Sequence, residues 1–210
     1  MATLVIDPGH GGSQSVGNSS ANNAKGPSGT LEKDVTLDIA LRLKPILDGK
    51  GHNTLLTRDA DVNLGLADRA KVAANSGASA FLSIHFNGDT NSSTQGSETW
   101  VHSTSTRDSR LLAASVQQRV DAATGYANRG VKSKGLGVLS LSYQSPGTAA
   151  CLVEISFLTD PNEEQRLGDD AYKNQVASSL ALALTDFLSG STSGPAVPTP
   201  EGDPSGEADG

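Results

Sequence analysis

The sequence contains very little cysteine and few aromatic residues, and both scarcities narrow the class of protein. Cys151 is the only cysteine among 210 residues, which excludes an internal disulfide and a zinc site built from several cysteines. Aromatic residues make up 4% of the chain, so aliphatic side chains must supply most of a buried core. No apolar run approaches the roughly 20 residues of a membrane-spanning helix. A globular domain of ordinary size remains.

Positive charge is also scarce. The chain has 16 Lys and Arg residues against 23 Asp and Glu residues, which gives a formal net charge of −7. The segment after Ser189 has no Lys or Arg and holds four of the acids, so the rest of the chain carries about −3. Because binding to phosphate backbones needs clustered cations, we expect no nucleic-acid partner.

Short apolar runs alternate along the chain with segments of helical period. Strands are expected at residues 3–6, 54–57, 80–86, 98–102, 137–141 and 149–155. Helices are expected at residues 31–48, 63–75 with Asn63 as its cap, 107–124, from Asp160 onward, and 172–188. This alternation predicts an α/β fold with a largely parallel sheet and helices on both faces.

Residues 190–210 differ in composition from residues 1–189. They are rich in Gly, Ser, Thr, Pro and acids and contain no aromatic residue, so they cannot bury enough apolar surface to fold. We therefore expect one catalytic domain over residues 1–189, followed by a disordered linker. A linker at this place is typical of a protein with a further C-terminal domain.

Four residues have the chemistry of a metal-dependent hydrolase. His10, His85 and Glu154 fall at the carboxyl ends of predicted strands, where open α/β sheets bind their ligands. Glu32 opens the first long helix. Two imidazoles and one carboxylate leave a zinc ion with an open position for water, and a second carboxylate can take the proton of that water.

Each of these residues also has a simpler interpretation on its own. A lone histidine at a strand end usually packs and makes a hydrogen bond, and Glu32 in a first turn would complement the helix dipole. Glu154 is stronger evidence for a functional site, since burying an acid within an apolar strand is costly unless the acid is paired or has a catalytic or binding role. Cys151 lies three residues earlier, on the opposite face of the same strand, and is expected to be a buried apolar residue.

Taken in order, several motifs resemble one known family. They are Asp7-Pro8-Gly9-His10-Gly11-Gly12, Leu31-Glu32-Lys33-Asp34, Ser83-Ile84-His85-Phe86-Asn87 and Leu152-Val153-Glu154-Ile155-Ser156-Phe157-Leu158-Thr159, with support from Gly96-Ser97-Glu98-Thr99-Trp100 and Arg129-Gly130-Val131-Lys132. The set resembles the zinc-dependent N-acetylmuramoyl-L-alanine amidases of the type 3 family, over Leu4 to about Leu188.

The resemblance implies a fold, a reaction and a set of residue roles. The fold would be a three-layer α/β sandwich around a mostly parallel six-stranded sheet. His10, Glu32 and His85 would bind Zn²⁺, and Glu154 would be the general acid and base. The substrate would be peptidoglycan, cut between the lactyl group of N-acetylmuramic acid and L-alanine. Arg129 is expected to help stabilise the oxyanion, and Asp7 is expected either to orient an imidazole or to form the turn.

The sequence also departs from the family pattern, and alternatives remain open. Residues 13–29 form a longer loop than usual, and Ser156 and Asp160 replace residues that are more common in the family. A zinc peptidase acting on the stem peptide would share the same metal residues, and an inactive wall-binding module would share the fold. The intact set of four residues favours the amidase.

The resemblance places the protein at the cell wall, outside the cell or in the periplasm, as a monomer. The amino-terminal residues show neither the basic segment nor the cleavage site of a signal peptide. We therefore expect either a mature form or release by another route, as for phage endolysins.

Overall fold

The computed structural model describes residues 1–191 and the backbone of residues 201–202. Its sheet has the strand order β2-β1-β3-β6-β4-β5-β7. The strands are β1 (Thr3–Pro8), β2 (Asn53–Leu56), β3 (Ala80–Asn87), β4 (Ser97–His102), β5 (Asn128–Lys134), β6 (Ala149–Phe157) and the two-residue β7 (Glu201–Gly202). The helices are α1 (Glu32–Gly49), α2 (Leu66–Ser76), α3 (Arg107–Thr124), α4 (Pro161–Leu167), α5 (Asp170–Leu188) and the 3₁₀ turn η1 (Gly137–Leu139).

The sheet is mostly parallel, as predicted. Strands β2, β1, β3 and β6 run in one direction. Strand β4 is antiparallel to β6, and β5 follows the direction of β4. Among the six longer strands, the strand direction therefore reverses once, between β6 and β4.

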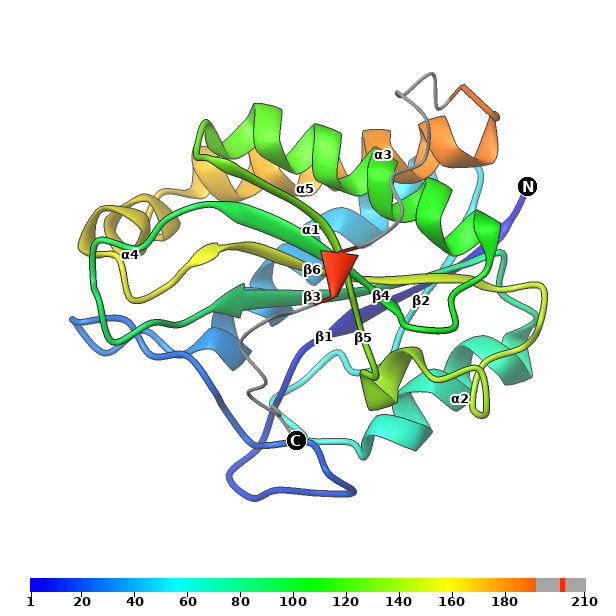
Figure 1. Cartoon of the computed structure of the whole chain (residues 1–210), viewed down its shortest axis with the longest axis horizontal. Helices are drawn as coiled ribbons and strands as arrows, with labels where there is room; N and C mark the ends of the chain where they lie inside the picture. The colour runs from blue at the N-terminus through cyan, green and yellow to red at the C-terminus, as the bar shows by residue number, and fades with distance from the viewer. Residues whose placement is uncertain (192–200, 203–210) are drawn as a thin grey trace.

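Successive side chains of the central strands point to opposite faces of the sheet, so the hydrophobic core has two parts. Leu82, Ile84, Cys151 and Val153 face the larger cluster, which is closed by α1, α3 and α5. Val5, Phe81 and Leu152 face the smaller cluster beneath α2 and η1. Figure 1 shows α1, α3 and α5 on one face of the sheet and α2 on the other. The three-layer sandwich and the buried apolar position of Cys151 are both confirmed.

Three predictions of local structure are wrong. Residues 137–141 were expected to be a strand, but Gly137–Leu139 form a 3₁₀ turn. The outer neighbour of β4 is instead β5, where no strand was predicted. Asn63 does not cap α2, which begins at Leu66 with Gly65 at its N-cap. The Asn63 amide instead donates to the carbonyl oxygens of Gln14 and Ser19 and ties down the loop after β1.

The linker predicted for residues 190–210 falls largely outside the described residues. The backbone of Glu201–Gly202 pairs in parallel with Lys132 and Ser133 of β5. Within the part of the chain that the structure describes, no helix is long and apolar enough to cross a membrane.

Candidate active site

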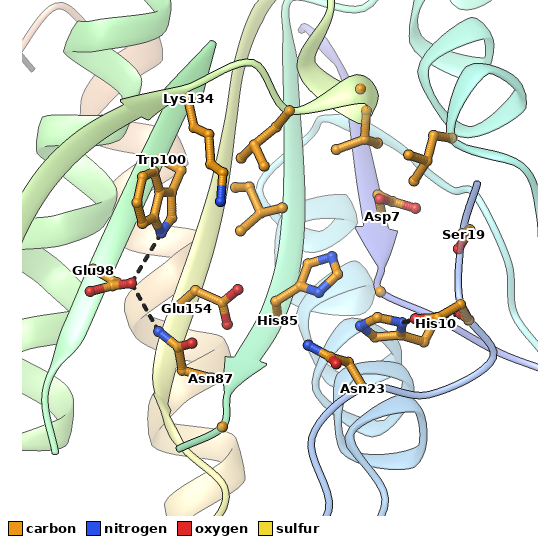
Figure 2. A pocket seen from close by; sticks show the side chains of 18 of the residues that line it. Asp7, His10, Ser19, Asn23, His85, Asn87, Glu98, Trp100, Lys134 and Glu154 are labelled. Carbon is orange, nitrogen blue, oxygen red and sulfur yellow. Dashed lines mark hydrogen bonds between the residues drawn. The ribbon is translucent and has the colours of Figure 1, made fainter. Parts of the chain in front are cut away.

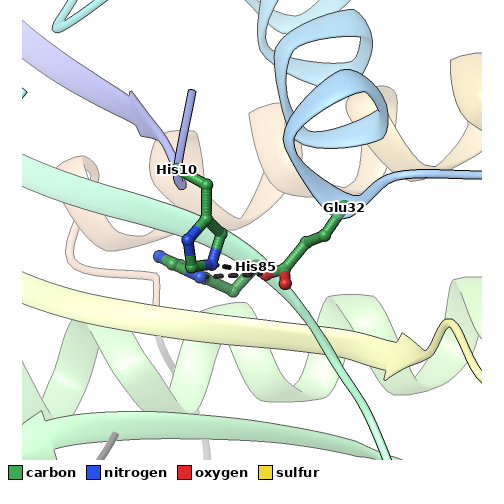
Figure 3. A group of neighbouring side chains, drawn as sticks. All are labelled: His10, Glu32 and His85. Atoms are coloured by element: carbon green, nitrogen blue, oxygen red, sulfur yellow. Dashed lines mark hydrogen bonds and ion pairs between the residues drawn. The ribbon is translucent and has the colours of Figure 1, made fainter. Parts of the chain in front are cut away.

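Three of the four predicted site residues meet at one point. Nε2 of His10 lies 3.2 Å from Oε1 of Glu32, and Nδ1 of His85 lies 3.1 Å from the same oxygen. One ligand atom from each residue lies within 4.8 Å of the others. Figure 3 shows the two imidazoles and the carboxylate converging from the end of β1, the first turn of α1 and β3. This is the donor set predicted for a zinc site.

The backbone after β1 aims the His10 ring at this point. His10 has a left-handed conformation, with φ of 61°, which is uncommon for a residue that is not glycine. Its Nδ1 lies 3.1 Å from the carbonyl oxygen of Ser20 and 3.0 Å from the Ser20 hydroxyl. A proton on Nδ1 would donate to that carbonyl, which leaves the lone pair of Nε2 facing Glu32 and His85.

The carboxylate of Glu32 is almost fully buried and fixed by the backbone. Oε2 accepts a hydrogen bond from the N–H of Ala24, and Oε1 accepts one from the N–H of Phe86. Burial alone would raise the pKa of Glu32, but the hydrogen bonds and charges of His10 and His85 outweigh burial and hold that pKa well below its usual value. Glu32 is therefore an anion ready to bind a cation.

His85 packs against a backbone that tolerates no side chain. A Cβ added to Gly9 would overlap the His85 ring, so glycine is required before His10. Burial lowers the pKa of His85, and the hydrogen bond to the Glu32 carboxylate only partly opposes this effect. A neutral imidazole is the form that binds a metal.

A buried ion pair holds the loop that carries His10. Asp7 and Arg69 are both about 1% exposed, with Oδ1 and Nη1 2.9 Å apart. Arg69 also donates to the carbonyl oxygens of Pro8 and His10. Asp7 accepts from Thr57 and Ser83 as well. The hypothesis that Asp7 orients an imidazole is therefore wrong, because its hydrogen-bond partners are Arg69 and two hydroxyl groups.

Glu154 lies one strand away from His85. The two residues are direct partners in the parallel pairing of β3 with β6. Directly opposite residues in neighbouring strands are about 5 Å apart at Cα. Both side chains point into the same cleft (Figure 2). Glu154 is half-buried, so its carboxylate reaches the cleft beside the three candidate metal ligands.

Glu98, for which the sequence predicted no role, lies beside Glu154 on the next strand of the sheet. Glu98 is the direct partner of Glu154 in the antiparallel pairing of β4 with β6. Its Oε1 accepts from Asn87 and Trp100, as Figure 2 shows, and its Oε2 accepts from Arg129 and Lys132. Burial would raise the pKa of Glu98, but Lys132 and Arg129 hold it below its usual value. The sequence pointed to Glu98 only through the motif Glu98-Thr99-Trp100, which supports the family resemblance.

These residues line one open cleft of about 490 Å³ on the α2 face of the sheet. One wall is rich in hydroxyl and amide groups from the loop after β1: Asn18, Ser19, Ser20 and Asn23. The other wall carries Arg129, Lys132 and Lys134 of β5. The candidate metal ligands His10 and His85 and the carboxylate of Glu154 lie between the two walls. Arg129 therefore lines the cleft, as predicted, and Cys151 does not.

Comparison with known proteins agrees with this geometry. A family model described as N-acetylmuramoyl-L-alanine amidase matches residues 4–186. The chain is 35% identical over 181 residues to the N-acetylmuramoyl-L-alanine amidase LytC of Bacillus subtilis, covering 85% of this chain and 34% of LytC. It thus spans about a third of that relative.

Solved structures show the same fold. The N-acetylmuramoyl-L-alanine amidase of Clostridium difficile 630 superposes with a TM-score of 0.79 at 32% identity, covering 90% of this chain and 97% of that one. The catalytic domain of CwlV from Bacillus (Paenibacillus) polymyxa gives a TM-score of 0.79 at 30% identity, covering 90% and 99%. With its converging His10, Glu32 and His85, this chain belongs to the N-acetylmuramoyl-L-alanine amidase family.

Proposed function

We propose that this chain is a zinc-dependent amidase that hydrolyses the bond between the lactyl group of N-acetylmuramic acid and L-alanine in peptidoglycan. The observation that supports this most is the convergence of His10, Glu32 and His85 beside Glu154 in a member of the amidase family. The proposal places its action at the cell wall, with peptidoglycan as the partner.

The donor set fits zinc. With the ring proton on Nδ1, the buried Nε2 of His10 turns its lone pair towards Oε1 of Glu32, 3.2 Å away, and no described residue donates to it. Two acceptors that face each other are costly unless a cation binds between them. His10, Glu32 and His85 would hold the ion and leave one position open, as catalytic zinc sites do. Bound zinc supplies a Lewis acid that polarises a carbonyl group and lowers the pKa of water to about 7.

The protein's own residues account for positioning and proton transfer. Glu154, one strand from His85, takes the proton of the attacking water and returns it to the L-alanine nitrogen as the C–N bond breaks. Ser20 fixes the His10 ring, and the backbone N–H groups of Ala24 and Phe86 fix the Glu32 carboxylate. The role of Arg129 in oxyanion stabilisation stays a prediction.

Digestion of purified peptidoglycan tests the proposal. We expect stem peptides that begin with L-alanine, detected by mass spectrometry, with release lost on chelation and restored by zinc. Shortened peptides still attached to muramic acid would indicate the peptidase instead, and no release at all would indicate a wall-binding module.

Two substitutions separate metal binding from proton transfer. Glu154→Gln should lower turnover by about 10²–10⁴-fold or more while zinc remains bound. His10→Ala should lose the zinc itself, measured by atomic absorption. His102→Ala is the matched control, because the His102 ring is hydrogen-bonded to Thr104 and lies outside the cluster. Wild-type turnover by Glu154→Gln would contradict the assignment.

A further inference from the structure

The cationic wall of the cleft holds an arginine whose outer donors are unused. The Nε of Arg129 donates to Oε2 of Glu98 at 2.8 Å. Its two terminal amino groups have no hydrogen-bond acceptor among the described residues, and 37% of the side chain is exposed. Paired terminal N–H groups of arginine match the two oxygens of a carboxylate. The exposed end of Arg129 is therefore shaped for an anionic group.

The surroundings of Arg129 hold this end in place. The guanidinium carbon lies 5.0 Å from the centre of the Phe157 ring. The side-chain stem runs against Gly96, where a Cβ would overlap it. With Glu98 fixing Nε, three neighbours restrict the rotamers of Arg129, so that less side-chain entropy remains to be lost on binding.

The charge of this wall favours an anion. The single carboxylate of Glu98 accepts from both Arg129 and Lys132, which leaves one excess positive charge in the group. Asp89 also lines the cleft, with its carboxylate bonded to the N–H of Asn91 and close enough to Arg129 for the arginine charge to help lower its pKa. The three cations of β5, Arg129, Lys132 and Lys134, still outnumber the carboxylates of Glu98 and Asp89 on this side of the cleft. An incoming carboxylate would therefore meet a net positive wall.

The position of Arg129 in the sheet separates it from the metal site. From His85 on β3, the row continues through Glu154 on β6 to Glu98 on β4. His85 and Glu98 are therefore two strand spacings apart, or roughly 10 Å. The guanidinium of Arg129 is hydrogen-bonded to Glu98, at the end of this row. An extended peptide covers about 3.3–3.6 Å per residue. Arg129 thus faces a group two or three residues beyond the bond that is cut.

We propose that Arg129 is a specificity residue that binds a free carboxylate at the second or third residue of the stem peptide. This rests on the proposed amidase function. The second residue of such stems is D-glutamate or its amide D-isoglutamine, and the third is often a diamino acid with or without a free carboxylate. The enzyme accordingly discriminates between walls whose stems are acidic and walls whose stems are amidated.

Matched synthetic substrates test this directly. One pair is MurNAc-L-Ala-D-Glu-L-Lys and MurNAc-L-Ala-D-isoGln-L-Lys, which differ only in one carboxylate. A second pair carries meso-diaminopimelate at the third residue, with its side-chain carboxyl group free or amidated. We expect the wild-type enzyme to show at least about 10-fold higher kcat/KM for the free acid in one pair, and that pair identifies which carboxylate is bound.

Variants of Arg129 then link the preference to this residue. Arg129→Gln should bring the kcat/KM ratio of that pair close to 1, mainly through KM, and Arg129→Lys should keep part of it. Arg129→Glu should reverse the preference. Lys50→Gln removes one positive charge at an exposed site that does not line the cleft, and should leave the ratio unchanged.

The outcomes are distinguishable. Equal wild-type rates within both pairs would overturn the inference while leaving the amidase function intact. An equal fall in kcat on all four substrates with Arg129→Gln would also overturn it and would indicate a role in the chemical step. If the wild-type enzyme released L-alanine peptides from none of the substrates, the proposed function itself would fail.

Discussion

Replacing Arg69 by methionine should be among the most damaging single changes in the molecule. Arg69 donates five hydrogen bonds to groups around the His10 loop: Asp7 Oδ1, Pro8 O, His10 O, Asn63 Oδ1 and Leu64 O. Arg69→Met keeps much of the volume but leaves the Asp7 carboxylate buried without its cation. Breaking a buried ion pair by removing one partner costs about 3–5 kcal/mol.

The cost is best measured by urea denaturation in the presence of a chelator, so that metal binding does not contribute. For a chain of this size, a loss of 3–5 kcal/mol corresponds to a fall in Tm of about 6–20 °C. The double variant Asp7→Asn/Arg69→Met should lose less than the sum of the two single variants, because each single change leaves a partner unpaired.

The control is Lys71→Met, two residues further along α2. Lys71 lies 3.6 Å from Asp68, and both side chains are more than half exposed, so its removal should change stability by no more than about 1 kcal/mol. A loss below about 1 kcal/mol for Arg69→Met, or strict additivity in the double variant, would refute the reasoning that the Asp7–Arg69 pair holds the His10 loop.

Three further predictions follow from the same geometry. Gly9→Ala should abolish zinc retention, since the new methyl group overlaps the His85 ring; wild-type zinc content by atomic absorption would contradict this. Saturating zinc, at about 100 times its Kd, should stabilise the fold by about 2.7 kcal/mol and raise Tm by roughly 5–11 °C, a shift that should vanish in His10→Ala. Burial would raise the pKa of Asp7, but the Arg69 charge and the hydrogen bonds from Thr57 and Ser83 lower it overall. The resulting stability is complete above the ordinary pKa near 3.9 and is lost as pH falls towards the lower folded value. Asp7→Asn should therefore show a shallower loss of stability than the wild type below pH 4 in chelator-treated samples, and parallel curves would contradict the assignment.

The central fold could be predicted because its signals are local. The apolar runs of β1, β3 and β6 and the helical periods of α1, α3 and α5 each appear within a short stretch of sequence. The right site residues could also be found, because His10, His85 and Glu154 each follow or end such a run. Their convergence then follows from the parallel pairing of the strands.

The cationic half of the cleft could not be predicted in the same way. Strand β5 contains few apolar residues, and a register shift lies in its pairing with β4, near Gly130 with its positive φ. Its polar side chains are stabilised by partners distant in the sequence, above all Glu98. Residues 137–141 looked like a strand because they are apolar, but Val138 and Leu139 are buried against the α2 side of the core. Contacts with residues distant in the sequence thus determine the structure both of β5 and of residues 137–141.

The reversal of strand direction between β6 and β4 has a practical consequence for engineering. The proposed catalytic residues come from β1, α1, β3 and β6, whereas the proposed carboxylate site comes from β4 and β5. The segment β4–α3–β5 is continuous in the chain, from Ser97 to Lys134. It meets β6 through the antiparallel pairing of β4 and through the packing of α3, which also contacts α5. We therefore expect that exchanging this segment between relatives redirects such enzymes to a different wall chemotype while the hydrolytic machinery stays in place.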